Sequence, residues 1–301
     1  MRNPRLLKIY CTNHVRTGYG KEDIETEQFL ESSLLYNADG KVLREEHYLS
    51  DKEPDTLVNN EYDENGRLIA TFQYDGNKVL IQKSEFYYDE QGNMTRQDNY
   101  FGEGSSVYTT GFIYTDGLLA RQDSYDCGQF AYIEKEYFYN DDRLLTKQIE
   151  YDEDGNKKYI ITNEYNADKL VVKRVREEIM EKDRRIYLFE YDRKGNKIKD
   201  LIYDYQEILI AKTYYTFDEL NRLIEKEDED LDHYMKTNYS YDGENVIKME
   251  MLDKDRNLLS WTEYSYDEDN QIISIRQYNA DEADDNNLRL VSEYRYERYY
   301  E

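Results

Sequence analysis

The sequence has few of the residues that build metal centres and disulfide frameworks. Its 301 residues include 2 cysteines and 3 histidines, beside 2 prolines and 1 tryptophan. Cys11 and Cys127 lie 116 positions apart and form no CxxC pair, so we expect two free thiols in a reducing compartment. His14, His47 and His233 lack the spacing of metal ligands, and surface or capping roles are expected for them. The sequence therefore predicts no metal and no cofactor.

Long hydrophobic runs are also missing. No stretch approaches the roughly 18 apolar residues of a membrane-spanning helix. The N-terminus "MRNPRLLKIYCTNHVRTGYG" is basic, but Lys8 interrupts its apolar run, which is too short for the core of a signal peptide. We therefore expect a cytoplasmic protein, or a secreted or surface protein if a signal peptide has been removed.

The sequence contains no G-x-S-x-G, no H-E-x-x-H and no nucleophile with a base at a defined spacing. The glycine-rich "FGEGSS" at Phe101 is not followed by GK[ST], which argues against phosphate binding. "DEDGNKK" at Asp152 starts like a calcium loop but lacks its later acids, and "EKEDEDLD" at Glu225 is interpreted as a solvated turn. The sequence therefore predicts a protein that is not an enzyme.

What the chain does contain is charge and tyrosine. Charged residues make up 35% of it, 34 residues are tyrosine, and the formal net charge is -26. Disordered acidic chains are poor in aromatic residues, so a folded protein is expected. Such a charge repels nucleic acid and anionic membranes and attracts a basic protein, although it would also serve solubility alone.

The charge is not spread evenly along the chain. Residues 168–200 hold 11 Lys/Arg against 8 Asp/Glu, whereas residues 217–301 hold 10 against 24. A mildly basic middle is therefore followed by a strongly acidic C-terminal third.

An aromatic residue followed by turn residues recurs along most of the chain, and we call these aromatic residues the anchors. Successive anchors are 26, 26, 26, 25, 26, 26, 26, 24 and 25 residues apart, a regularity typical of stacked repeats. The anchors are Tyr36, Tyr62, Tyr88, Tyr114, Tyr139, Tyr165, Tyr191, Phe217, Tyr241 and Tyr266. A second aromatic often stands two positions earlier, which is strand spacing with both rings on one face: Phe86, Phe112, Tyr137, Phe189, Tyr215, Tyr239 and Tyr264.

Each anchor begins a predicted hairpin turn. The Asp or Asn that usually follows can start a type I turn, and a later Gly or Asn accepts a left-handed backbone, as in "YDENGRLI". A three-residue loop with a bulge would pair Tyr62 with Leu68, Tyr88 with Met94, Tyr191 with Lys197 and Tyr266 with Ile272. Anchors of neighbouring repeats would then lie two strands apart, in a row of tyrosines.

A second turn follows each anchor by about 12 residues, at Tyr74, Tyr100, Tyr125, Tyr151 and Leu252. The predicted fold is therefore all-β, an antiparallel meander of about ten 26-residue two-stranded repeats that forms a long twisted or coiled sheet. Residues 31–280 would be the repeat array, with an N-terminal cap at 1–30 and a C-terminal cap at 281–301 that protect the sheet edges. The segment from Val171 to Tyr191 can also be read as a helix, but it lies at a strand position of the period.

The anchors resemble the motif of RHS/YD-repeat proteins, which reads roughly Y-x-Y-D-x-x-G-R-L. "NEYDENGRLIA" at Asn60, "FYYDEQGNM" at Phe86 and "FEYDRKGNKI" at Phe189 carry most of it, and the likeness extends over roughly residues 34 to 275. The period is longer than the usual YD spacing, and many repeats lack the glycine. A weaker likeness is to bacterial MORN-variant antitoxin repeats. Either resemblance implies a bacterial repeat protein that binds a partner, and the first implies a β-sheet shell or spiral.

We therefore expect a non-enzymatic protein that binds a basic protein partner, in concrete terms an immunity or antitoxin-like factor for a basic toxin. A carbohydrate-binding protein or a structural surface repeat protein is the alternative. The tyrosine rows are the feature best suited to binding, because aromatic rings serve as protein hot spots and stack on sugars. The predicted contact residues are Trp261, Tyr264, Tyr266, Tyr239, Tyr241 and Tyr215.

Overall fold

A computed structural model describes residues 3–18, 23–49, 54–102, 107–281 and 284–300, and these form 22 β-strands. The first eleven are β1 (Leu6–Arg16), β2 (Ile24–Tyr36), β3 (Val42–His47), β4 (Thr56–Tyr62), β5 (Leu68–Asp75), β6 (Leu80–Tyr88), β7 (Met94–Phe101), β8 (Val107–Thr115), β9 (Leu118–Asp126), β10 (Gln129–Tyr139) and β11 (Leu145–Tyr151). The others are β12 (Lys157–Tyr165), β13 (Val171–Glu178), β14 (Asp183–Tyr191), β15 (Lys197–Tyr203), β16 (Leu209–Phe217), β17 (Leu223–Asp230), β18 (Tyr234–Asp242), β19 (Asn245–Leu252), β20 (Leu258–Tyr266), β21 (Ile272–Asp281) and β22 (Asp284–Tyr299). The expected all-β fold is confirmed. The alternative of a helix from Val171 to Tyr191 is wrong, because β13 and β14 occupy that segment.

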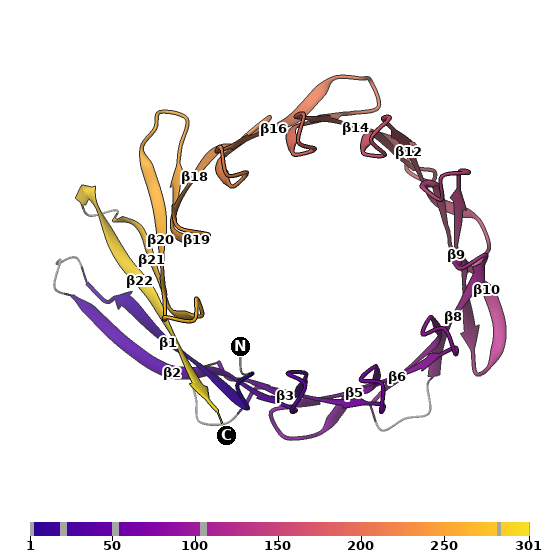
Figure 1. Cartoon of the computed structure of the whole chain (residues 1–301), viewed down its shortest axis with the longest axis horizontal. Coiled ribbons are helices and arrows are strands. Elements are labelled where there is room, and N and C mark those ends of the chain that lie inside the picture. Colours follow the sequence, from indigo (N-terminus) through magenta and orange to yellow (C-terminus); the bar gives the residue numbers. More distant parts are fainter. Residues whose placement is uncertain (1–2, 19–22, 50–53, 103–106, 282–283, 301) are drawn as a thin grey trace. The chain divides into compact units, whose positions relative to one another are not determined.

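The chain divides into two compact units. Unit 1 comprises Met1–Lys83, Phe217–Glu225 and Met235–Glu301, and unit 2 comprises Ser84–Thr216 and Lys226–Tyr234. Within each unit, strands that follow one another in the chain pair antiparallel, as β13 does with β14 and β20 with β21. The antiparallel meander is thus confirmed, and Figure 1 shows the strands of each unit following one another in chain order.

The hairpin turns have the chemistry that the sequence predicts. In the turn after β14, Asp192 Oδ1 accepts the backbone N–H groups of Lys194 (2.8 Å) and Asn196 (2.9 Å). Gly195, at the fourth position of this turn, has a φ of 88°. The predicted pairs Tyr62↔Leu68, Tyr191↔Lys197 and Tyr266↔Ile272 are confirmed, each beside a β-bulge, whereas Tyr88 with Met94 stays a prediction.

Each anchor hydroxyl that has a recorded partner donates a hydrogen bond to the neighbouring hairpin. Tyr191, at the end of β14, donates to the carbonyl oxygen of Val171 at the start of β13 (2.7 Å). The same bond, over 2.7 to 3.1 Å, joins Tyr62 to Val42, Tyr114 to Met94, Tyr139 to Leu119, Tyr165 to Leu145, Tyr241 to Leu223 and Tyr266 to Val246. We call this set the tyrosine ladder. Each bond of the ladder ties a hairpin to the one before it.

The buried core is small. Among the described residues, the buried hydrophobic side chains are Cys11, Leu57, Ala70, Ile149, Val175 and Ile186. Val175 and Ile186 lie opposite each other on β13 and β14. Buried polar side chains are more numerous, and Asp98, with no exposed surface, is held by Arg96 (Nε to Oδ1, 2.8 Å) and by the Thr109 hydroxyl (2.6 Å). Hydrogen bonds between polar side chains therefore contribute to the interior of this sheet beside apolar packing.

The first and last strands pair with each other. The ladder between β1 and β22 runs from Leu6↔Tyr299 to Asn13↔Ser292. This pairing corrects the expectation of a long twisted or coiled sheet with two ends to protect, because it satisfies the backbone groups that a free terminal strand would expose. The segments expected to act as caps contain β1, part of β2 and β22. At the end of β22, Arg298 Nη1 donates to the carbonyl oxygen of Ile272 at the start of β21 (2.8 Å).

Candidate functional site

Side chains of each strand alternate between two faces of the sheet. We call the face that carries the anchors the tyrosine face. In unit 2, Glu150 of β11 lies opposite Tyr159 of β12, which lies opposite Glu178 of β13. Tyr159 is six residues before the anchor Tyr165 on β12, and the extra residue of the bulge near Tyr165 lies on β13, so this row of three side chains belongs to the tyrosine face.

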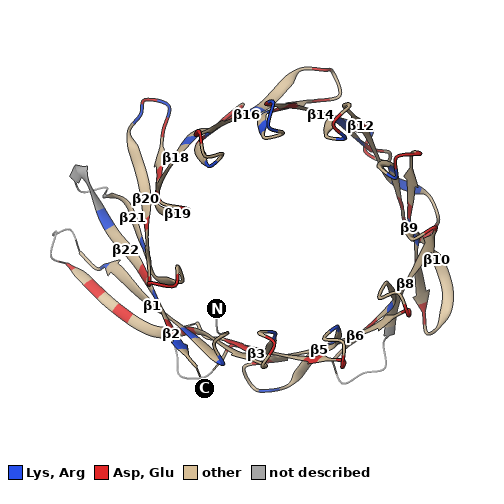
Figure 2. Cartoon of the chain, viewed as in Figure 1, with Lys and Arg blue, Asp and Glu red and all other residues tan. Residues whose placement is uncertain are grey.

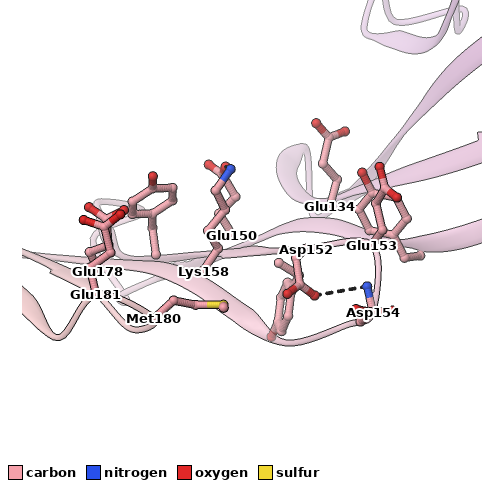
Figure 3. Close-up of a pocket in the computed structure, with 12 residues that line it drawn as sticks. Glu134, Glu150, Asp152, Glu153, Asp154, Lys158, Glu178, Met180 and Glu181 are labelled. Atoms are coloured by element: carbon pink, nitrogen blue, oxygen red, sulfur yellow. Dashed lines mark hydrogen bonds and ion pairs between the residues drawn. The ribbon is translucent and has the colours of Figure 1, made fainter.

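This row is part of a groove of about 680 Å³ in unit 2, which we call the acidic groove. The groove is bounded by the ends of β11 and β13 and by the turns that follow them, opposite the ends that carry the anchors. Figure 3 shows Glu134, Glu150 and Glu178 projecting from the same side of the ribbon. It is lined by Tyr132, Glu134, Glu150, Tyr151, Asp152, Glu153, Asp154, Lys158, Tyr159, Glu178, Met180 and Glu181.

Carboxylates outnumber amines in the acidic groove by seven to one. Among the described residues, Glu150 is the one groove acid that forms ion pairs, with Lys135 and Lys158, each at 3.9 Å. Glu134 Oε2 is buried and accepts no hydrogen bond from the described residues. Carboxylates so close together, with little neutralisation, create a strongly negative local potential.

One of the seven carboxylates, that of Asp152, accepts hydrogen bonds within its own turn. Asp152 Oδ1 accepts the N–H groups of Asp154 (3.1 Å) and Asn156 (2.8 Å), and these bonds, that from Asn156 first, lower the pKa of Asp152. The candidate calcium loop at Asp152 is therefore an ordinary hairpin turn. No group of three or more His, Cys, Asp or Glu side chains suited to a metal ion occurs in the part of the chain that the structure describes.

Two tyrosines of the acidic groove, Tyr151 and Tyr132, remain protonated at neutral pH. Burial, followed by the hydrogen bond that its hydroxyl donates to Glu136, raises the pKa of Tyr151 to about 12. Burial likewise raises the pKa of Tyr132 to about 12. The neutral rings provide a stacking surface for an ammonium or guanidinium group, and the neighbouring carboxylates provide its counter-charge.

The predicted contact residues do not form one surface. Trp261 lies three positions before Tyr264 on β20, and the register is regular between them, so the two side chains lie on opposite faces. Trp261 packs on Tyr278 with ring centroids 5.0 Å apart, and Lys248 Nζ lies 4.5 Å from its centroid. The odd spacing in the sequence was the signal for this separation.

The other predicted residues lie on the tyrosine face, half-buried. Tyr241 and Tyr266 belong to the tyrosine ladder, with bonds of 2.7 and 2.8 Å, and Tyr239 and Tyr264 stand two positions before them. In unit 2, Tyr215 donates to Asp200 Oδ2 (3.0 Å). A contact role for these residues stays a prediction.

The sequence did not single out the acidic groove. Its acids come from β10, β11, β13 and two turns, and none of these segments is exceptional alone. The available signal was the coincidence of acidic second turns in consecutive repeats, at 152–154 and 178–181. Among the described residues, no helix has the length and apolar character needed to cross a membrane.

No family model and no curated protein matches the chain. Among solved structures, a porin-like protein from Bacteroides uniformis is 8% identical, with 97% of this chain and 95% of that chain covered and a TM-score of 0.37. A porin-like protein from Bacteroides vulgatus is 11% identical over 89% of this chain and 100% of that chain, with a TM-score of 0.26. The Photorhabdus luminescens Tc holotoxin pore is 10% identical over 89% of this chain and 23% of that chain, with a TM-score of 0.21. TM-scores below 0.5 establish no shared fold, so the function has to be inferred from the residues of this chain.

Proposed function

We propose that this is a non-enzymatic binding protein that holds a basic segment of a protein partner in the acidic groove. The observation that carries the proposal is a groove with seven carboxylates, one amine and three tyrosine rings. A guanidinium group pairs with carboxylates through two parallel hydrogen bonds and stacks on aromatic faces, so arginine satisfies both features.

The formal net charge of -26 favours the same kind of partner. Long-range attraction speeds the encounter with a basic protein, and salt screens it. Net charge alone does not define where the partner binds, whereas the acidic groove provides a specific binding site. An immunity or antitoxin-like factor for a basic toxin is the concrete form of this proposal.

The test measures the affinity of a fluorescently labelled oligo-arginine peptide for the full chain by anisotropy. The groove variant replaces Glu153→Gln and Glu181→Gln, two exposed carboxylates with no recorded ion pair. The control replaces Glu244→Gln and Glu268→Gln, exposed turn residues of unit 1, and changes the net charge equally. We expect the groove variant to weaken binding about tenfold and the control less than about twofold.

Two results would contradict the proposal. Equal weakening by both variants would show that the peptide responds only to net charge. No binding by the wild-type chain at about 50 mM salt, where screening is modest, would remove the acidic groove as a site for basic segments.

A further inference from the structure

Unit 2 also contains a basic site that binding of a basic partner does not use. The excess of Lys and Arg over residues 168–200 is local, since the whole chain carries a charge of -26. Figure 2 shows Lys and Arg, in blue, beside β12 and β14. Two of these arginines lie together on the tyrosine face.

Arg176 of β13 lies directly opposite Arg185 of β14 in the antiparallel ladder. Like charges at directly opposed positions destabilise a sheet, because the side chains are held within about 5 Å of each other at Cβ. The next pair toward the turn, Glu178↔Asp183, is also a like-charge pair. A register shift of two residues would place an arginine opposite an acid. In the observed register, arginine faces arginine and acid faces acid.

The two guanidinium groups use only part of their hydrogen-bonding capacity within the described residues. Arg185 Nε donates to Asp183 Oδ2 (3.1 Å). Arg176 lies over the Tyr159 ring, 4.6 Å from its centroid, and has no recorded ion pair among the described residues. Terminal N–H groups of both arginines therefore have donor capacity left for a ligand.

Both arginines line a second groove of unit 2, of about 590 Å³, which we call the arginine groove. Its apolar wall includes Ile202, Ile210 and Leu231. The acids at its edge are engaged: Asp183 with Arg185, and Asp230 with the N–H groups of Asp232 (2.9 Å) and His233 (2.8 Å). The remaining acid, Asp232, is exposed.

We propose that the arginine groove binds an oxyanion, a carboxylate or a phosphate, carried on a small apolar body. Arg176 and Arg185 hold the anion between them, because a guanidinium fork matches the geometry of both groups. Binding removes the repulsion between the two arginines, and the apolar body covers Ile202 and Ile210. The two grooves share no lining residue, although Arg176 lies over Tyr159 of the acidic groove, and the proposal does not depend on the function proposed for that groove.

The test uses hexanoate and inorganic phosphate as probes, at constant ionic strength maintained with chloride. Dissociation constants are measured by ligand-observed NMR on the full chain and on the variants Arg176→Gln and Arg185→Gln. The matched control is Arg184→Gln, the neighbouring arginine on the opposite face, which lies 3.8 Å from Glu177 and 3.6 Å from Glu207. We expect each groove variant to weaken binding at least about fivefold and the control less than about twofold.

The two probes separate the sources of the anion. Tighter binding of hexanoate indicates a carboxylate on an apolar body, and tighter binding of phosphate indicates a phosphorylated ligand. Arg176→Lys keeps the charge but loses the fork, so its affinity should lie between those of wild type and Arg176→Gln. The proposal fails if neither probe binds the wild-type chain, or if Arg184→Gln weakens binding as much as the groove variants do.

Discussion

The hydroxyl group of an anchor tyrosine has a structural role that a phenylalanine ring could not supply. Tyr191 reaches from the end of β14 to the carbonyl oxygen of Val171 at the start of β13, where the bulge interrupts the backbone ladder. Burial raises the pKa of this hydroxyl, so it remains a donor to a higher pH than the hydroxyl of a free tyrosine does. The sequence predicts that the anchor rings line up, but the acceptor is set by the register of the neighbouring hairpin and could not be predicted.

Tyr191→Phe should lower the stability of the protein. The substitution removes the bond to Val171 and leaves that carbonyl oxygen without its side-chain partner, a loss of about 1 kcal/mol. Tyr214→Phe is the control, since Tyr214 is 40% exposed and its hydroxyl has no recorded hydrogen bond. Urea denaturation followed by circular dichroism measures both, and equal stability of the two variants would remove the tyrosine ladder as a source of stability.

The turn aspartates should make stability depend on pH at the acid end. Asn196 and backbone N–H groups lower the pKa of Asp192 from its usual value of 3.8, so the folded state binds this proton less readily than the unfolded state. The stabilisation is present above the unfolded pKa and is lost as the pH falls through the lower folded pKa.

Asp192→Asn keeps an acceptor oxygen, as the native turns at Asn37 and Asn166 do, but does not titrate. We expect the variant to melt below wild type at pH 7, with the difference shrinking as the pH is lowered through and below the usual value of 3.8. Thermal melts across this range measure it. A difference in melting temperature that does not change with pH would contradict the assignment.

At the scale of the element, the hairpin turns of this protein share one conformation, in which the fourth residue has a left-handed backbone. Several residue types occupy that fourth position. Gly195 and Arg256 occupy equivalent positions of two hairpins, with φ values of 88° and 67°. The sequence predicts these hairpins and their bulges because Asp, Asn and Gly are fixed by local geometry. It does not predict the acidic groove, because that site combines the ends of several strands, whose alignment depends on the length of every intervening turn.

Arg256→Gly should stabilise the turn between β19 and β20, and Gly195→Ala should destabilise the turn between β14 and β15. A non-glycine residue in the left-handed region costs about 1 kcal/mol relative to glycine. The two substitutions should therefore shift the urea midpoint in opposite directions. Movement in the same direction would mean that the turn conformation does not control stability at these positions.

At the scale of the whole molecule, the pairing of β1 with β22 is the feature that periodicity did not reveal. The repeat determines which strands are neighbours along the chain, whereas β1 and β22 are far apart in the sequence and no repeat motif marks them as partners. The anchor series also ends before Arg298, so no motif marked the contact between this side chain and Ile272.

Deleting residues 284–301 should expose the edges of β1 and β21 and cause association. Unpaired strand edges are templates for pairing with another chain. Light scattering with size-exclusion chromatography should show a mass that rises with protein concentration for the truncated chain. Arg298→Gln, which removes one hydrogen bond and leaves β22 in place, is the control and should keep the wild-type mass. A truncated chain whose mass stays constant would show that β22 is not needed to protect these edges.

The same pairing has a consequence for how the protein is made. Unit 2 is drawn from a nearly continuous stretch of chain, whereas unit 1 uses both ends. A ribosome that adds about 5 to 20 residues per second needs roughly 15 to 60 s to reach β22 after it has made β1. During that interval the nascent β1 can pair with β2 but not with β22. Unit 1 is completed when β22 has emerged from the ribosome. Factors that shield exposed strand edges during translation should therefore matter more for the yield of this protein than for that of a chain whose sheet is finished in sequence order.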